Sequence, residues 1–193
     1  LRRMRRERRA GIRRISFLAA GLVCAVVVRA AAADGDPRIT RIKAWYAATE
    51  KGLPKNRVVR RDLAEFAPEG AVLTAYFAGD TLRKMFVIYY ADAGRATDEY
   101  YLHHDSVYFV SHIVGRYSAS VYGRLIHRVQ YRMYLDNESL LRWVDTAGKE
   151  LPVKSQAADS AVERSLVMAR IFVACATQGG PEESCINPER VAK

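Results

Sequence analysis

The sequence lacks the compact motifs that usually identify an enzyme. It contains no glycine-rich phosphate loop and no strand-to-helix serine elbow, which mark many nucleotide-binding proteins and serine hydrolases. Its histidines are only four, His103, His104, His112 and His127, and they do not have the short spacing of a metal-ligand motif. These absences favour a binding role over catalysis, with no cofactor and no metal.

No hydrophobic run in the chain is long enough to span a bilayer on its own. The main apolar stretch, residues 15–28, has 14 residues, whereas a membrane-spanning helix needs about 20. Eight arginines precede it within residues 2–14, and small residues follow at 30–33. This order is typical of a secretory signal peptide. We expect residues 1–33 to be removed, with cleavage near Ala33/Asp34, and the remainder to be periplasmic or secreted.

Two other fates of this leader remain open. An uncleaved leader would anchor the protein in the membrane, and Arg13-Arg14 before the apolar stretch resembles the start of a twin-arginine export signal. Ser16 stands where that signal has an apolar residue, which favours the ordinary secretory route. Lipid attachment at Cys24 is not expected, because Leu22-Val23 lacks the small residue that precedes a lipoprotein cysteine.

The high positive charge of the chain belongs to its leader. Nine of the 31 basic residues and one of the 21 acidic residues lie in residues 1–33, so residues 34–193 carry 22 basic and 20 acidic residues. The formal net charge falls from +10 to about +2, which gives no support for nucleic-acid binding. Arg57, Arg60 and Arg61 form a small basic group that we interpret as solvated surface.

Only two cysteines remain outside the leader, Cys175 and Cys185, and they enclose Gly179-Gly180-Pro181. In an oxidising compartment an even pair across a flexible turn predicts one disulfide closing the loop 175–185. A loop of this size would stabilise the fold by roughly 3 kcal/mol on the chain-entropy model. A redox-active pair is less favoured because the two cysteines of catalytic dithiols usually lie closer in sequence. Metal ligation is also less favoured because no histidine lies near these cysteines.

A short phrase occurs three times, at residues 75–82, 100–107 and 133–140. Each copy has a polar pair between alternating apolar residues, which predicts strand, two-residue turn and strand. The turns are placed at Gly79-Asp80, His104-Asp105 and Asn137-Glu138. The cross-strand pairs that this register predicts are all apolar: Phe77 with Leu82, Leu102 with Val107, and Leu135 with Leu140.

These hairpins indicate an α+β domain over residues 34–193, an antiparallel β-meander of about six strands between an N-terminal and a C-terminal helix. The strands are expected at 71–78, 81–90, 96–103, 106–114, 125–135 and 140–145, so the meander covers 71–145. Residues 55–70 are ambiguous between strand and helical turn. The first helix, 37–51, has Asp36 as N-cap; the second, 160–176, begins with a capping box at Ser160.

The same register assigns the alternate positions to the opposite face of the sheet. Each of the three hairpins contributes three residues to that face. They are Tyr76, Arg83 and Met85 from the first hairpin, Tyr101, Tyr108 and Val110 from the second, and Tyr134, Leu141 and Trp143 from the third. Tyrosine, tryptophan and arginine are typical of binding surfaces, so we interpret Tyr76, Arg83, Tyr101, Tyr108, Tyr134 and Trp143 as binding residues. The alternative is that the two helices cover these rings as an ordinary half-buried sheet surface.

The phrase at Tyr76 to Lys84, continued at Tyr101 to Val107 and Tyr134 to Arg142, resembles uncharacterised secreted bacterial proteins built on hairpin phrases of the YY-DG-KL kind. It also resembles MORN-type hairpin repeats, although the regular glycines of that family are missing. The resemblance implies a hairpin fold and an envelope location, and it transfers no catalytic residue.

Two functional hypotheses follow. The first is an exported, non-enzymatic binding module of the bacterial envelope whose partner is an unknown envelope protein or glycan. The second is a small periplasmic hydrolase or metal-dependent enzyme that uses the histidine and carboxylate positions of the sheet. Its candidate groups are His103, His112 and His127 with Asp105 or Glu99, and the carboxylate pairs Asp98-Glu99 and Asp136 with Glu138.

Overall fold

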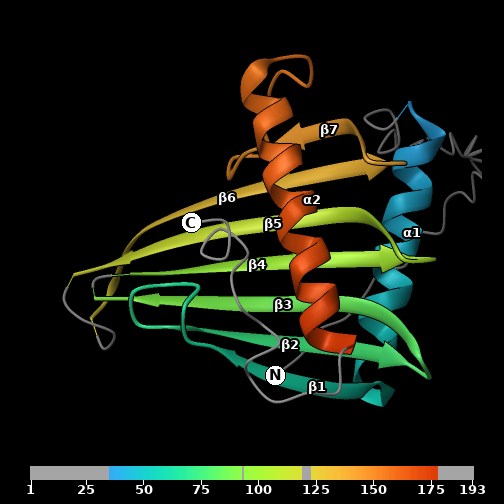
Figure 1. The fold of residues 1–193 in the computed structure, drawn as a ribbon. Coiled ribbons are helices and arrows are strands. Elements are labelled where there is room, and N and C mark those ends of the chain that lie inside the picture. Colours follow the sequence, from blue (N-terminus) through green and yellow to red (C-terminus); the bar gives the residue numbers. More distant parts are fainter. Residues whose placement is uncertain (1–34, 93, 119–122, 178–193) are drawn as a thin grey trace, which may run out of the picture. The chain divides into compact units, whose positions relative to one another are not determined.

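The fold is one antiparallel sheet with a helix on each face (Figure 1). The computed structural model describes residues 35–92, 94–118 and 123–177. The elements are α1 (Pro37–Gly52), a 3-10 turn (Leu53–Lys55), β1 (Arg57–Leu63), β2 (Ala71–Ala78), β3 (Thr81–Ala91), β4 (Gly94–His103), β5 (Ser106–Tyr117), β6 (Leu125–Asp136), β7 (Ser139–Val144) and α2 (Gln156–Thr177). Within these described ranges, no helix is long and apolar enough to cross a membrane.

The sheet is a meander of seven strands in the order β1 to β7. The prediction of an antiparallel meander between two helices is confirmed, and the sheet has seven strands where about six were expected. The seventh strand is β1, which lies in the segment that the sequence leaves ambiguous. It pairs with β2 from Arg57 opposite Phe77 to Leu63 opposite Ala71.

The predicted register of the three hairpins is confirmed. Phe77 lies opposite Leu82, Leu102 opposite Val107, and Leu135 opposite Leu140. The turns between them use left-handed backbone, with φ of 49° and 61° at His104 and Asp105, and 48° and 65° at Asn137 and Glu138. Positive φ at both central residues matches the right-handed twist of the paired strands.

Each hairpin contains a β-bulge directly after the confirmed pair. The register shifts between Tyr76 and Phe77, between Tyr101 and Leu102, and between Tyr134 and Leu135. The partner strand therefore holds one extra residue in each hairpin: Arg83, Tyr108 and Leu141. Because successive side chains alternate between faces, the extra residue reverses the face of everything beyond it. Met85, Val110 and Trp143 consequently lie on the face opposite to the one predicted.

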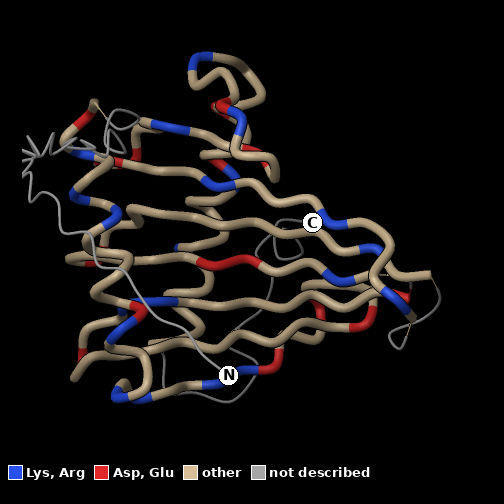
Figure 2. The backbone as a smooth tube through the Cα atoms, turned by 180° about the vertical axis from the view of Figure 1, so that it is seen from behind, with Lys and Arg blue, Asp and Glu red and all other residues tan. Residues whose placement is uncertain are grey.

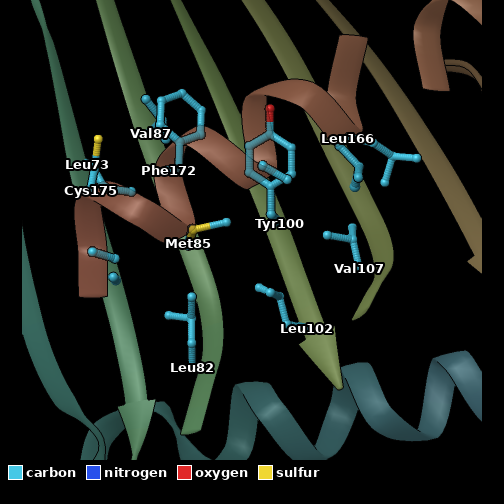
Figure 3. Packing of buried hydrophobic residues seen from close by; sticks show 14 of the residues in the cluster. Leu73, Leu82, Met85, Val87, Tyr100, Leu102, Val107, Leu166, Phe172 and Cys175 are labelled. Atoms are coloured by element: carbon cyan, nitrogen blue, oxygen red, sulfur yellow. The ribbon is translucent and has the colours of Figure 1, made fainter. Parts of the chain in front are cut away.

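Helix α2 covers the face that carries Phe77, Leu82 and Leu102 (Figure 1). Figure 3 shows Phe172 and Leu166 of α2 against Met85, Tyr100 and other strand residues of this core. Phe172 is fully buried and its ring lies 5.8 Å from that of Tyr100. The prediction that the apolar face of the second helix lies against the sheet is confirmed.

The start of α2 differs from the prediction. The helix begins at Gln156, where the hydroxyl of Ser155 accepts a hydrogen bond from the backbone N–H of Ala158 at 3.2 Å. The capping box at Ser160 is therefore wrong. Ser155 provides an equally good N-cap one turn earlier, and residues 156–159 contain nothing that breaks a helix.

Helix α1 covers the other face near the hairpin turns. Asp36 caps it as predicted, accepting from the N–H of Arg38 at 2.9 Å. Ile39 and Ile42 are buried against a cluster of sheet residues: Tyr101, Tyr108, Phe109, Tyr134 and Val144. The two helices thus bury opposite faces of one sheet, and each face has its own hydrophobic core.

Candidate functional site

The predicted aromatic binding surface is not exposed. Tyr101, Tyr108 and Tyr134 are 0%, 3% and 9% exposed, because α1 covers them. Trp143 lies on the opposite face, beyond the bulge of the last hairpin. Tyr76 and Arg83 are half-buried. The prediction of one exposed surface made from these residues is therefore wrong, since α1 buries three rings and the bulge removes the tryptophan.

Under α1 the tyrosines surround a partly buried ionic cluster. The ammonium group of Lys84 lies 2.8 Å from a carboxylate oxygen of Glu50 and 3.3 Å from one of Glu99. The hydroxyl of Tyr101 donates to Glu50 at 2.7 Å. All of these polar groups satisfy one another, and the cluster ties α1 to β3 and β4. Its geometry is that of a structural network.

The pKa values of this cluster agree with that role. Burial acts to lower the pKa of Lys84, but Glu50 and Glu99 outweigh it and raise the pKa. Burial acts to raise the pKa of Glu50, but the hydrogen bonds from Lys84 and Tyr101 lower it overall. Lys84 and Glu50 therefore stay charged over a wide range of pH, as an ion pair that holds α1 on the sheet requires.

The C-terminal half of α1 borders a hollow of mixed polar and apolar lining that we call the α1 pocket. It has a volume of about 290 Å³ and is lined by Trp45, Ala48, Thr49, Gly52, Asn56, Ala78, Arg83 and His103. The rings of Trp45 and His103 stack at 4.0 Å. Burial and neighbouring positive charges lower the pKa of His103, so this imidazole is neutral at physiological pH. The pocket is open and offers few groups that converge on one point.

A second hollow, between α2 and the sheet, combines an apolar wall with converging polar groups. We call it the α2 cleft. Its volume is about 170 Å³, and its lining residues are Asp98, Tyr100, Val110, His112, Tyr131, Met133, Trp143, Ala161, Arg164, Ser165 and Met168. These residues come from β4, β5, β6, β7 and α2. Because the cleft is built on strands and a helix, the positions of its side chains are well defined.

At the centre of the cleft, Asp98 holds His112 in a fixed orientation. The two residues are direct partners across β4 and β5, and Nδ1 of His112 hydrogen-bonds a carboxylate oxygen of Asp98. The other oxygen of Asp98 accepts hydrogen bonds from Tyr89 at 3.0 Å and Tyr100 at 3.1 Å. The carboxylate is thus fully used, and Nε2 is the ring nitrogen of His112 that remains for another partner.

The surroundings keep this histidine cationic to higher pH. The hydrogen bond that His112 donates to Asp98 raises the pKa of His112 above its usual value of 6.5, and this exceeds the opposing effects of burial and of the nearby Arg164. Burial, reinforced by the negative charge of Asp98, raises the pKa values of Tyr89 and Tyr100. Both tyrosines therefore remain neutral donors to the carboxylate.

Trp143 and Arg164 each carry a donor that has no partner within the described residues. The indole nitrogen of Trp143 is closed off from solvent and makes no hydrogen bond, so a molecule in the cleft reaches the ring of Trp143 but not its N–H. Arg164 is exposed on α2 and makes no ion pair with any described residue. Arg164 is therefore the donor that stays available to a molecule in the cleft, together with Nε2 of His112.

The predicted metal and acid–base groups are not brought together. Within residues 35–92, 94–118 and 123–177, no three or more His, Cys, Asp and Glu side chains gather as a metal site would require. Asp98 lies on the α2 face and Glu99 on the α1 face. Asp136 pairs with Arg41 of α1 and Glu138 with Arg170 of α2, so this carboxylate pair is also divided.

Comparison with known proteins finds no counterpart for this arrangement. No protein-family model matches the chain, and no curated protein or solved structure is significantly similar to it. The chemistry of the site itself is what indicates the function.

Proposed function

We propose that this protein is an exported, non-enzymatic binding protein that holds a small organic molecule in the α2 cleft. The observation that carries the proposal is a cleft lined by the fixed imidazole of His112, the guanidinium of Arg164 and apolar side chains of α2 and the sheet. Binding sites for small molecules commonly combine a mainly apolar lining with a few oriented polar groups.

The apolar part of the cleft supports this function. Val110 and Met133 of the sheet face Met168 of α2 across the cleft, and Trp143 adds a large aromatic surface. Burial of apolar ligand surface supplies most of the affinity, at about 25 cal/mol per Å². The polar groups then determine the orientation of the ligand and its identity.

The exported location is supported by the sequence of residues 1–33, which lie outside the described residues. The predicted disulfide partner Cys185 also lies outside them. Cys175 is 1% exposed in the α2 core. Intact-mass measurement of protein recovered from the periplasm or medium tests the location, with a chain that begins near Asp34 as the expected result. Recovery of the full-length chain from the membrane fraction would contradict it.

The binding function is tested by filling the cleft. Ala161 lines the cleft, so Ala161→Trp places an indole in the ligand's space. Val167 is 43% exposed on the same helix, and Val167→Trp is the matched control. Each protein is incubated with a small-molecule extract, washed and analysed by mass spectrometry. Compounds retained by the wild type and by Val167→Trp but not by Ala161→Trp support the proposal; identical retention by all three proteins refutes it.

A hydrolase is the second candidate, and one observation favours it. A carboxylate that fixes Nδ1 of a histidine leaves Nε2 available as a general base. Hydrolysis of p-nitrophenyl acetate by the wild type, abolished in His112→Ala and retained in Glu99→Gln, would favour the enzyme. Glu99 is a suitable control because it lies on the other face of the sheet.

A further inference from the structure

We infer that the ligand of the α2 cleft is a small aromatic or branched monocarboxylate, with its carboxylate at His112 and Arg164 and its apolar part against α2 and the ring of Trp143. This inference depends on the proposed function, because it specifies the chemical class of the molecule held in that cleft. It is carried by the donor character, the charge balance and the size of the cleft.

Two cationic donors line the cleft. Below the raised pKa of His112 its Nε2 carries a proton and donates, as the guanidinium of Arg164 does. Ser165 donates its hydroxyl hydrogen to the carbonyl of Ala161 at 2.8 Å. A ligand that satisfies both cationic donors must present acceptor oxygens, and a carboxylate provides two of them with about four lone-pair sites.

The charges of the cleft favour one negative charge on the ligand. Asp98, the acidic residue in the lining, is neutralised by His112 and further satisfied by Tyr89 and Tyr100. Arg164 is then the uncompensated charge, and Tyr131 and Ser165 are neutral. A monoanion completes the balance. A cation would face Arg164 and His112 without any free carboxylate.

The size of the cleft limits the apolar part to about one ring. The volume is about 170 Å³, and apolar protein cavities of roughly 150 Å³ bind benzene. Val110, Met133 and Met168 provide flexible or branched contacts for such a ring, and Trp143 provides an aromatic partner. A phenyl ring with a short carboxylate arm therefore matches both halves of the cleft.

Phenylacetate, phenylacetamide and phenethylamine are suitable probes, since they share one ring and differ in the charge of the arm. Each is titrated into uniformly ¹⁵N-labelled protein at pH 6, and dissociation constants are obtained from the shifts of amide signals. Phenylacetate, a ligand of about ten non-hydrogen atoms, is expected to bind the protein with a Kd on the order of 1 mM. Phenylacetamide is expected to bind about tenfold more weakly, and phenethylamine not at all.

Arg164→Glu and Arg170→Glu form a matched pair of variants on α2. Arg170 is exposed and pairs with Glu138 outside the cleft. We expect Arg164→Glu to weaken phenylacetate binding about tenfold or more and Arg170→Glu to leave it unchanged. Equal affinity for phenylacetate and phenylacetamide, unaffected by Arg164→Glu, would overturn the carboxylate class while the cleft itself still binds. Absence of phenylacetate binding would also overturn the inference, whereas the retention experiment with Ala161→Trp decides the proposed function separately.

Discussion

Asp98 and His112 lie directly opposite each other on β4 and β5, and the carboxylate of Asp98 accepts a hydrogen bond from Nδ1 of the imidazole. Two tyrosine hydroxyls complete the coordination of the carboxylate. The pair is the polar centre of the α2 cleft, and the rest of the functional argument depends on its geometry.

The first prediction concerns the pKa of His112. Because Asp98 stabilises the imidazolium, the pKa of His112 measured by NMR titration should lie above 6.5. Replacing Asp98 with Asn removes the negative charge and should bring the pKa of His112 to 6.5 or below. His127 is exposed on β6 and is not part of the cleft lining, so its ring signals serve as an internal reference in the spectra. A His112 pKa that does not respond to Asp98→Asn would disprove the pairing.

The same pair should make stability depend on pH. The folded state binds the His112 proton more tightly than the unfolded state does, so the stabilisation is complete below about pH 6.5. It should be lost as the pH rises through the higher pKa of the folded state. Urea denaturation of the wild type and of His112→Gln, carried out from about pH 5 to about pH 9, measures this effect. The difference in unfolding free energy between the two proteins should be larger at the acidic end.

The second prediction concerns the ionic cluster under α1. Lys84→Ala leaves Glu50 and Glu99 without their cation and should lower the free energy of unfolding by about 2 kcal/mol or more. Lys51 is exposed on the same helix as Glu50, and Lys51→Ala should change stability by less than about 0.5 kcal/mol. Chemical denaturation measures both. Equal effects of the two substitutions would show that Lys84 is not the buried partner.

The third prediction concerns the hairpin turns. Glu138 has φ of 65°, a conformation that glycine adopts without the penalty of a Cβ atom. Glu138→Gly removes this strain but also removes the exposed ion pair of Glu138 with Arg170. The net result should be a rise of about 0.5–1 kcal/mol in the free energy of unfolding. Gly79 has φ of 61°, so Gly79→Ala should lower it by about 1 kcal/mol. Thermal melting should show the two variants moving in opposite directions.

The hairpin register is predictable from the sequence because three copies of one phrase supply the same constraint. The cross-strand pairs and the two-residue turns follow from alternation and turn chemistry alone. The bulges do not, since one extra residue leaves no clear mark in the pattern of apolar residues. Without the bulge, the register that pairs Leu102 with Val107 would continue along the strands and place Asp98 opposite Ser111. The bulge shifts the partner by one residue to His112, and this is why the central pair of the cleft is missed.

The burial of individual side chains is also beyond the sequence pattern. The repeat aligns Lys84 with Phe109 and Arg142, which predicts a position that accepts any type of residue. In the structure Lys84 is only 7% exposed, because Glu50 of α1 and Glu99 of β4 form ion pairs with its ammonium group. Similarly, nothing in the tyrosine pattern distinguishes an exposed surface from one that α1 covers. Such outcomes depend on where a distant helix packs, and local periodicity does not contain that information.

The location of the ligand site can be tested most directly through the two tryptophans of the chain. Trp143 lines the α2 cleft and Trp45 lines the α1 pocket on the other face of the sheet, so their indole N–H signals report on the two sites separately. Trp45→Phe assigns the two signals, and phenylacetate is then added to ¹⁵N-labelled wild-type protein. We predict a progressive shift of the Trp143 signal and none of the Trp45 signal. No shift of either signal would contradict the carboxylate class of the ligand, and a shift of the Trp45 signal alone would contradict the assignment of function to the α2 cleft.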